Sequence, residues 1–147
     1  MSAKKTLLFS KWILGACATE ALQHKLVSQT IRSQKFLDET KLECGDIVQV
    51  ALQRVPLNTE RFPEGYVADY IGNVKIASIT PVNLGELEAL DVVRGGFLSL
   101  LQLQNALRRA GWRYKALSCF SAYRVTFGWV QPDEKFLNES ALACVKL

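Results

Sequence analysis

The sequence predicts an α+β fold, with a small β-barrel or curved mixed sheet and flanking helices. Three observations predict it. Turn residues separate short stretches rich in β-branched and aromatic residues. Two segments carry helix caps and helical periodicity. Strands and helices do not alternate regularly, which favours a mixed sheet over a parallel doubly wound one. The 147 residues contain no repeat and no linker, so we expect a single domain over residues 1–147.

Turn residues and caps locate the elements of the first half of the chain. Ser10 is a suitable N-cap for a first helix, and Gly45-Asp46 marks a turn before a strand. Gly72-Asn73 marks the turn of a hairpin, whose second strand is expected to end at Pro81. The expected elements are a strand at 6–9, a helix at 11–23, an extended segment at 26–32, and strands at 47–54, 66–71 and 74–80.

Two helices are expected next. Asn83 with Glu86 predicts the start of a short helix, which should stop before Gly95-Gly96. Ser99 with Gln102 forms a capping box for the clearest helix of the chain. Its buried stripe is expected to consist of Leu100, Leu103 and Leu107, with Arg108 and Arg109 in the last turn and Gly111 after it.

The last expected strand covers residues 119–130. Tyr123, Val125 and Phe127 alternate there with smaller or polar residues, which is typical of a half-buried strand. The tail from Pro132 predicts a short helix or an edge strand.

The composition argues against a membrane protein, a zinc site and disulfides. The apolar stretch at 12–18 is far shorter than the about 20 residues of a membrane helix. Lys11 interrupts what would otherwise resemble a signal peptide, so we expect a cytoplasmic protein with free, mostly buried thiols. The lone His24 has no identifiable partner and is expected at the surface; no metal or cofactor is expected. The cysteines are Cys17, Cys44, Cys119 and Cys144.

The net charge of +4 hides a segregated pattern. Residues 1–35 carry six Lys/Arg against one acid, residues 36–92 carry four against ten, and residues 93–131 carry six against none. If the two basic segments meet in space, they form a surface suited to phosphates. The alternative is that these charges spread over a solvated surface.

Three segments, taken in order, resemble a known family. They are Ser28–Arg32, Gly45–Val50, and Gly96–Ser99 followed by the strand at 121–127. Together they are similar to the ASCH domain, a relative of the PUA-like RNA-binding β-barrels, over roughly residues 5–130. The resemblance implies a small PUA-like β-barrel with a cleft beside the Thr30–Arg32 segment. It also implies binding of RNA or of modified nucleosides.

Some bacterial members of that family are amidohydrolases that remove the acetyl group of N4-acetylcytidine with a lysine, a threonine and a glutamate. Thr30 matches the threonine. Val27 stands at the lysine position, with Lys25 as the nearest substitute, and no acid lies at 94–96, with Asp91 as the closest. Valine cannot activate a hydroxyl group, and glycine cannot relay a proton. We therefore assign no catalytic residue.

The candidate binding residues centre on two strands. Thr30 and Arg32 share one strand face, where a hydroxyl group binds a base or sugar and a guanidinium binds a phosphate. Alternatively, Arg32 is exposed or pairs with an acid such as Asp46. Tyr123 stacks on a base or belongs to the core. The candidates for nucleic-acid binding are Lys11, Trp12, Lys25, Ser28, Thr30, Arg32, Lys35, Tyr123 and Arg124.

Three functions follow from this pattern. The leading hypothesis is a non-catalytic module with a basic cleft that binds RNA or a modified nucleotide. Aromatic and basic residues alternate at 112–115, which is typical of a nucleic-acid surface and also of a structural loop. The first alternative is an amidohydrolase acting on N4-acetylcytidine-like nucleosides. The second is a protein-interaction or inhibitory role, because a fold does not dictate its function.

Overall fold

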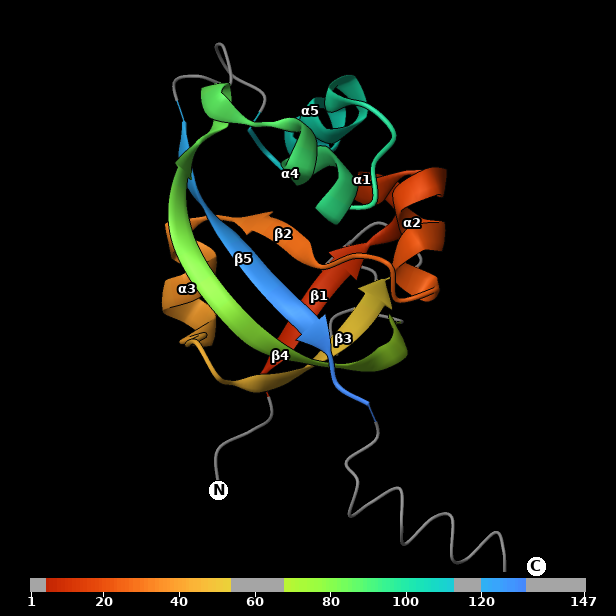
Figure 1. Ribbon diagram of the computed structural model, residues 1–147, viewed down its shortest axis with the longest axis vertical. Helices are drawn as coiled ribbons and strands as arrows, with labels where there is room; N and C mark the ends of the chain where they lie inside the picture. Colours follow the sequence, from red (N-terminus) through yellow and green to blue (C-terminus); the bar gives the residue numbers. More distant parts are fainter. Residues whose placement is uncertain (1–4, 54–67, 113–119, 132–147) are drawn as a thin grey trace, which may run out of the picture.

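One five-stranded sheet organises the molecule. The computed structural model describes residues 5–53, 68–112 and 120–131. The strands lie in the order β1-β3-β4-β5-β2, with β1 parallel to β3 and every other pair antiparallel. The sheet is strongly curved and forms an open half-barrel, as Figure 1 shows. The strands are β1 (Thr6–Ser10), β2 (Gln29–Arg32), β3 (Ile47–Gln53), β4 (Ala68–Asn83) and β5 (Ser121–Trp129).

Helices flank this sheet, so the predicted α+β fold with a curved mixed sheet is confirmed. Four helices, α1, α2, α4 and α5, gather near one another at one end of the sheet, whereas α3 lies apart from them (Figure 1). None of the helices in the described residues is long and apolar enough to cross a membrane. The helices are α1 (Lys11–Leu14), α2 (Ala16–Gln23), α3 (Gln34–Thr40), the 3₁₀ turn η1 (Leu84–Glu86), α4 (Ala89–Arg94) and α5 (Leu100–Arg109).

The hairpin predicted at Gly72-Asn73 is wrong, because both residues lie inside the 16-residue strand β4. Glycine is required there by packing rather than by a turn. A Cβ at Gly72 would lie 3.2 Å from side-chain carbons of Lys25 and Trp129. The neighbouring strand β3 has a register shift between Val50 and Ala51, opposite this point, where the sheet bends.

Pro81 does not end a strand either, since β4 continues to Asn83. β3 pairs with β4 only as far as Lys75, and the later part of β4 pairs with β5 alone. This stretch of β4 therefore has a neighbouring strand on one side only, and Pro81 is exposed there. Proline, which has no backbone N–H to donate, is tolerated at such an edge. Three residues of the predicted strands lie outside the described residues: Arg54, Tyr66 and Val67.

The single helix predicted over 11–23 is divided in two at Gly15, whose φ of 83° ends α1 and precedes α2. Ser10 occupies the N-cap position of α1, but its side chain does not cap the helix. Its hydroxyl group instead lies 3.3 Å from Oε1 of Gln53 on β3.

The second predicted helix is also divided. Asn83 accepts a hydrogen bond from the backbone N–H of Gly85, yet only the turn η1 follows. Helix α4 begins at a new cap, Glu88, whose backbone N–H donates to Oδ2 of Asp91 at 2.8 Å.

The capping box predicted for α5 is confirmed in part. Ser99 accepts from the N–H of Gln102, while the Gln102 side chain accepts from Leu98 rather than from Ser99. Leu100 does not belong to the buried stripe, because it is 42% exposed. The buried residues of α5 are Leu103, Ala106 and Leu107.

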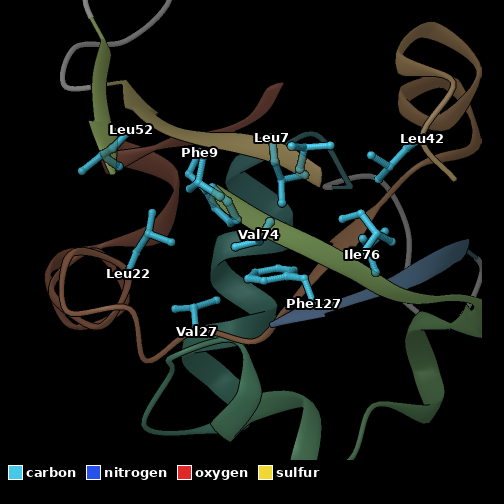
Figure 2. Close-up of a cluster of buried hydrophobic side chains, with 12 residues drawn as sticks. Leu7, Phe9, Leu22, Val27, Leu42, Leu52, Val74, Ile76 and Phe127 are labelled. Carbon is cyan, nitrogen blue, oxygen red and sulfur yellow. The ribbon is translucent and has the colours of Figure 1, made fainter. Parts of the chain in front are cut away.

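Within the residues that the structure describes, two apolar clusters form the core. The first fills the concave side of the half-barrel, and Figure 2 shows side chains from β1, β3, β4 and β5 converging on it. The second lies between the sheet and helices α4 and α5. β5 contributes to both clusters, with Val125 and Phe127 in the first and Ala122 in the second. The tail from Pro132, for which an element was predicted, lies outside the described residues, as does Cys119.

Leu52→Ala should destabilise the protein by about 2–5 kcal/mol, because Leu52 is fully buried and its removal leaves a cavity. Ile47→Ala on the same strand is the matched control, since Ile47 is 60% exposed; it should cost about 1 kcal/mol or less. Urea unfolding measures both values. Equal losses for the two variants would contradict the described core.

Gly96→Ala should be more destabilising than Gly45→Ala by about 1–3 kcal/mol. The two glycines have nearly the same positive φ, 86° and 90°, which a residue with a Cβ rarely adopts. A Cβ at Gly96 would lie 2.9 Å from atoms of Ala21 and Val27, whereas nothing lies within 4 Å at Gly45. The difference in unfolding free energy between the two variants therefore measures the crowding of the added methyl group at position 96, apart from backbone strain. Equal losses of stability in the two variants would contradict the described packing around Gly96.

Candidate functional site

A cavity of about 470 Å³ opens where the half-barrel fails to close. β1 and β2 are the two outermost strands of the sheet and do not pair with each other, yet both line this cavity. Helices α1 and α5 and the segment after α4 cover it. This volume lies within the range of small-molecule sites. The apolar walls include Phe9, Trp12, Ile13, Phe36, Phe97, Leu103 and Trp112, and the polar lining consists of Ser10, Gln29, Thr30, Arg32, Ser33, Gln53 and Asp91.

Arg32 on β2 spans the gap between the two outer strands. Its Nη2 donates to the backbone oxygen of Leu8 on β1 at 2.7 Å, and its Nε donates to Oγ1 of Thr30 at 3.1 Å. The guanidinium carbon lies 4.8 Å from the ring centre of Phe9 and 4.7 Å from that of Phe36. The two aromatic rings hold the cation in a fixed position by cation–π attraction.

The charge of Arg32 has no carboxylate partner within the described part of the chain. Burial lowers the pKa of its guanidinium to about 10, so the group stays protonated at neutral pH. The alternative interpretation, in which Arg32 is exposed or pairs with Asp46, is wrong, because Arg32 is half-buried and Asp46 binds Lys5 at 2.7 Å. Only two of the five N–H donors of Arg32 bind described protein atoms. A positive charge with free donors therefore lines the cavity.

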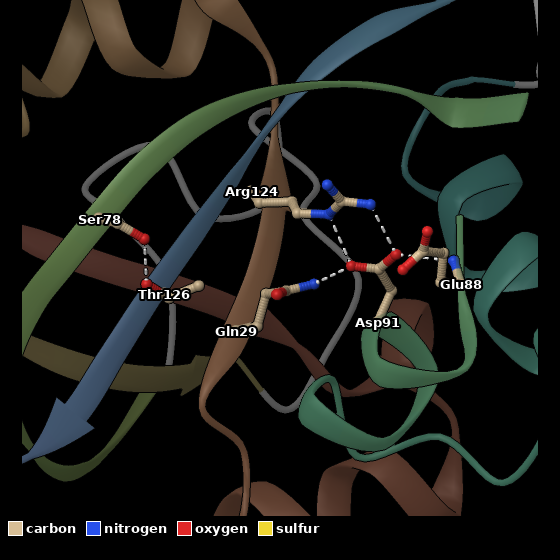
Figure 3. Close-up of polar contacts among 6 residues, drawn as sticks. All are labelled: Gln29, Ser78, Glu88, Asp91, Arg124 and Thr126. Carbon is tan, nitrogen blue, oxygen red and sulfur yellow. Dashed lines mark hydrogen bonds and ion pairs between the residues drawn. The ribbon is translucent and has the colours of Figure 1, made fainter. Parts of the chain in front are cut away.

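A second polar group in the wall is fully paired (Figure 3). Asp91 on α4 is 4% exposed. Arg124 on β5 binds both of its oxygens, at 2.7 and 2.9 Å, and Nε2 of Gln29 donates to Oδ1 at 2.7 Å. The backbone N–H of Glu88 completes the set at 2.8 Å. Burial favours the neutral acid, but the hydrogen bonds from Arg124, Glu88 and Gln29 outweigh it and hold the pKa of Asp91 below its ordinary value.

Two glutamines of the cavity wall keep an unpaired polar atom. Gln29 and Gln53 are each 2% exposed. Oε1 of Gln29 and Nε2 of Gln53 are buried without a hydrogen-bond partner in the described structure. Most buried polar atoms of proteins are paired, so these two are exceptions that require a reason.

Three of the residues predicted for nucleic-acid binding, Trp12, Thr30 and Arg32, line this cavity together. Thr30 and Arg32 share a strand face as expected. Ser28 is half-buried beside them and does not line the cavity; its backbone binds Arg94 and Phe127.

The predicted lysines lie elsewhere. Lys11 is exposed, and Lys35 is exposed and lies 3.9 Å from Glu39. The ammonium group of Lys25 lies 6.0 Å from the ring centre of Trp129. Arg32 is the only cation among the lining residues that the structure describes. The basic residues therefore do not combine into the predicted groove at this place.

The two candidates on β5 face partners other than the cavity. Tyr123 donates through its hydroxyl group to Gln34 on α3 at 2.6 Å, so it belongs neither to the core nor to the cavity wall. Arg124 binds Asp91 behind the wall. Trp112 does line the cavity, while the alternating residues 113–115 lie outside the described residues.

Sequence reasoning missed Gln29 and Gln53. Both stand in strands beside residues that are buried and apolar, Ile31 and Leu52. A glutamine at such a position is unusual, because buried polar side chains require partners. That pattern was the available signal, but no local rule identifies the partners.

In the described part of the chain, the cavity does not bring together the lysine, threonine and acid that the amidohydrolases of the ASCH family use. Thr30 lines the cavity with Asp91, yet Lys25 does not line it. All four hydrogen bonds to the Asp91 carboxylate come from protein donors, and its lowered pKa is unsuited to a general base at neutral pH. In the described residues, no three His, Cys, Asp or Glu side chains group as metal ligands. Cys17 and Cys44 are exposed free thiols, so the expectation of buried cysteines is wrong for these two.

Comparisons with known proteins support the fold and leave the function open. No family model matches the sequence, and no curated protein matches it. The structure is similar to the crystal structure of protein EF3133 from Enterococcus faecalis V583, described with the family model DUF984. The TM-score is 0.57 at 9% sequence identity, over 88% of this chain and 82% of the other. At this identity the likeness shows the fold alone.

Asp91→Asn should lower the free energy of unfolding at pH 7 by about 1–3 kcal/mol, because it removes the charged partner of Arg124. It should also flatten the acid dependence. A carboxyl group whose pKa is lowered by folding stabilises the protein above its ordinary pKa, and that contribution is lost as the pH falls through the folded value. Urea unfolding between pH 6 and pH 3 measures the slope.

The matched control for this change is Asp38→Asn, which removes a carboxylate from the exposed face of α3. It should change the free energy of unfolding at pH 7 by about 0.5 kcal/mol or less, as is usual for a substitution at an exposed position. An Asp91→Asn protein with the parental slope would contradict the role given to this carboxylate.

Proposed function

We propose that this protein is a non-catalytic module that binds a nucleotide, free or as one unstacked nucleotide of an RNA, in the cavity between β1 and β2. The observation that carries the proposal is the uncompensated Arg32 guanidinium in the wall of an otherwise largely apolar cavity. The resemblance of Ser28–Arg32 and the other two segments to the ASCH domain agrees with it, and we propose that relationship as well.

The position of Arg32 fits one anionic group. Arg32 is half-buried, and a cation that has lost part of its water gains from an anion beside it; no described carboxylate pairs with Arg32. The guanidinium carbon lies within 5 Å of the ring centres of both Phe9 and Phe36, at 4.8 and 4.7 Å, and three of its N–H donors remain unpaired. A fixed guanidinium fork matches the geometry of phosphate oxygens.

The rest of the wall fits a flat, partly apolar body. Trp12, Phe97 and Trp112 line the same cavity as Arg32. Aromatic side chains offer faces on which a nucleobase stacks, and such stacking contributes about 1–3 kcal/mol per base. One cation beside aromatic walls indicates a single nucleotide rather than a long charged backbone, which would need a continuous basic track.

The alternatives have less support. The amidohydrolase needs a lysine beside Thr30 and an available acid, whereas Lys25 lies elsewhere and Asp91 is fully paired. One observation favours the protein-interaction role, an exposed apolar segment. Its side chains are between 56% and 75% exposed: Leu90, Val93, Leu98 and Leu101. Nothing in the described structure indicates what would cover it, so the cavity carries the proposal.

Arg32→Gln should weaken nucleotide binding about 10- to 100-fold, because it removes a charge-assisted contact to the phosphate. Arg32→Lys keeps the charge without the planar fork and should be intermediate. Isothermal titration calorimetry with the four nucleoside 5′-monophosphates, and with a short single-stranded RNA, measures the affinities. The parent protein should also bind each nucleotide more tightly than the corresponding nucleoside.

Lys35→Gln is the control, since it removes one exposed positive charge outside the cavity and should change affinity less than twofold. A salt series should give a shallow slope of about 1, as expected for one phosphate contact. The proposal is wrong if the parent protein binds neither nucleotides nor RNA, or if folded Arg32→Gln protein binds them as tightly as the parent.

A further inference from the structure

Two contacts of Arg32 within the protein leave neighbouring nitrogens of its guanidinium with free N–H groups. Nε donates to Oγ1 of Thr30, and Nη2 uses one of its two N–H groups for the backbone oxygen of Leu8. Nη1 has no partner in the described part of the chain, so both of its N–H groups and one on Nη2 remain. Two oxygens of one anionic group match such a pair of nitrogens. Arg32 is therefore prepared for an anion with two accessible oxygens.

A single positive charge is left in the wall of the cavity. Among the lining residues that the structure describes, two side chains are ionisable, Arg32 and Asp91. Asp91 is neutralised by Arg124, which binds both of its oxygens. Arg109 on α5 is exposed and does not line the cavity; its Nε donates to the backbone oxygen of Ile13. One negative charge on a ligand is therefore balanced here, whereas a second one is not.

A second negative charge in this cavity would lie against apolar walls. The ring centres of Phe9 and Phe36 lie 4.8 and 4.7 Å from the guanidinium carbon. Phe97, Leu103 and Leu107 line the same cavity, and each is 9% exposed or less. An anionic oxygen that loses water against such walls, and gains no cation in return, weakens binding. The cavity therefore favours a ligand whose anionic group carries one negative charge.

Phosphate esters differ in this respect. A phosphodiester carries one negative charge, shared by two free oxygens. A phosphomonoester carries about −1.5 to −2 at neutral pH, because its second pKa is about 6. We infer that the cavity selects a nucleotide whose phosphate is a diester, and that Nη1 and Nη2 of Arg32 bind its two free oxygens. This inference rests on the proposed nucleotide site. The same group occurs in an internal nucleotide of single-stranded RNA and in a 3′,5′-cyclic nucleotide.

Ligand pairs that differ by one charge test the inference in the parent protein. Each nucleoside 5′-monophosphate is compared with its 5′-methyl ester, which is a phosphodiester, by isothermal titration calorimetry. At pH 7.5 the methyl ester should bind about threefold to tenfold more tightly, because the monoester brings a charge that nothing balances. At pH 5 the monoester is mostly monoanionic, so the ratio should fall to about twofold or less. The ratio at pH 5 measures what the methyl group adds by itself.

The charge of the lining residues is constant over this pH range. The pKa of Arg32 is about 10, and the pKa of Asp91 is held below its ordinary value, so both stay ionised between pH 5 and pH 7.5. The methyl esters keep one charge throughout and report any other change in the protein. The remaining charged residues of the helices around the cavity are exposed and do not line it: Lys11, Lys35, Asp38, Glu39, Arg94, Arg108 and Arg109.

A second cation in the wall should remove the preference. Ala110, which follows α5, lines the cavity and is exposed, so Ala110→Lys adds a positive charge there without disturbing a buried position. It should strengthen the binding of the monoesters and bring the ratio at pH 7.5 to about twofold or less. The control is Ala77→Lys on β4, at an exposed position that does not line the cavity; it should keep the parental ratio.

Two further ligands distinguish the sources of the phosphodiester. A single-stranded trinucleotide and the 3′,5′-cyclic nucleotides should each bind more tightly than the 5′-monophosphates at pH 7.5. Tighter binding of the trinucleotide identifies RNA as the source, and tighter binding of a cyclic nucleotide identifies a small molecule.

The outcomes separate this inference from the proposed function. Monophosphates that bind at pH 7.5 as tightly as their methyl esters would overturn the inference and leave the nucleotide site intact. Absence of binding by every nucleotide and every ester would overturn both. A ratio that is the same at pH 5 and pH 7.5, or that stays unchanged in folded Ala110→Lys protein, would also overturn the assignment of the preference to charge.

Discussion

The sheet of this protein curves into a half-barrel but does not close, and Arg32 spans the opening. β1 and β2 are its outer strands, and the guanidinium of Arg32 on β2 donates to the backbone of Leu8 on β1. An unpaired strand edge exposes polar backbone groups that need partners. The side chain of Arg32 satisfies part of that need here, and residues of both outer strands line the cavity. The gap between the two outer strands and the candidate site are therefore the same feature.

The polar side chains of the cavity wall are of two kinds, those whose groups are fully paired within the protein and those that keep unpaired groups. Asp91 receives hydrogen bonds from Arg124, Gln29 and the backbone, which satisfy it fully within the protein. Arg32 is stacked and bonded, but its charge is not compensated by any acid in the described residues. Paired groups fix geometry, whereas unpaired ones are available to a ligand. The described wall therefore combines a fully paired carboxylate with a cation that keeps three unpaired N–H donors.

Much of the secondary structure could be predicted from local rules. The strands β1, β3 and β5 and the N-cap of α5 follow from alternation, turn residues and a capping side chain, which act over a few residues. Gly72 and Pro81 predicted a turn and a strand end that do not exist, because glycine and proline occur in turns and also, where packing or a free edge permits, in strands. Position 72 requires a residue without a side chain, because Lys25 and Trp129 pack against it. Pro81 is tolerated because the pairing of β4 with β3 stops at Lys75, before it. Neither neighbour is visible in the local sequence.

By itself, the sequence determined the α+β class and the shared face of Thr30 and Arg32, because residues two apart in a strand point the same way. Only the tertiary structure decided that Trp12 and Arg32 meet in one cavity, that Lys25 lies outside it, and that the amides of Gln29 and Gln53 keep a free atom each. Those facts depend on which distant segments come into contact and on which charges lose their water. Burial and pairing are properties of the assembled fold, and no local pattern contains them.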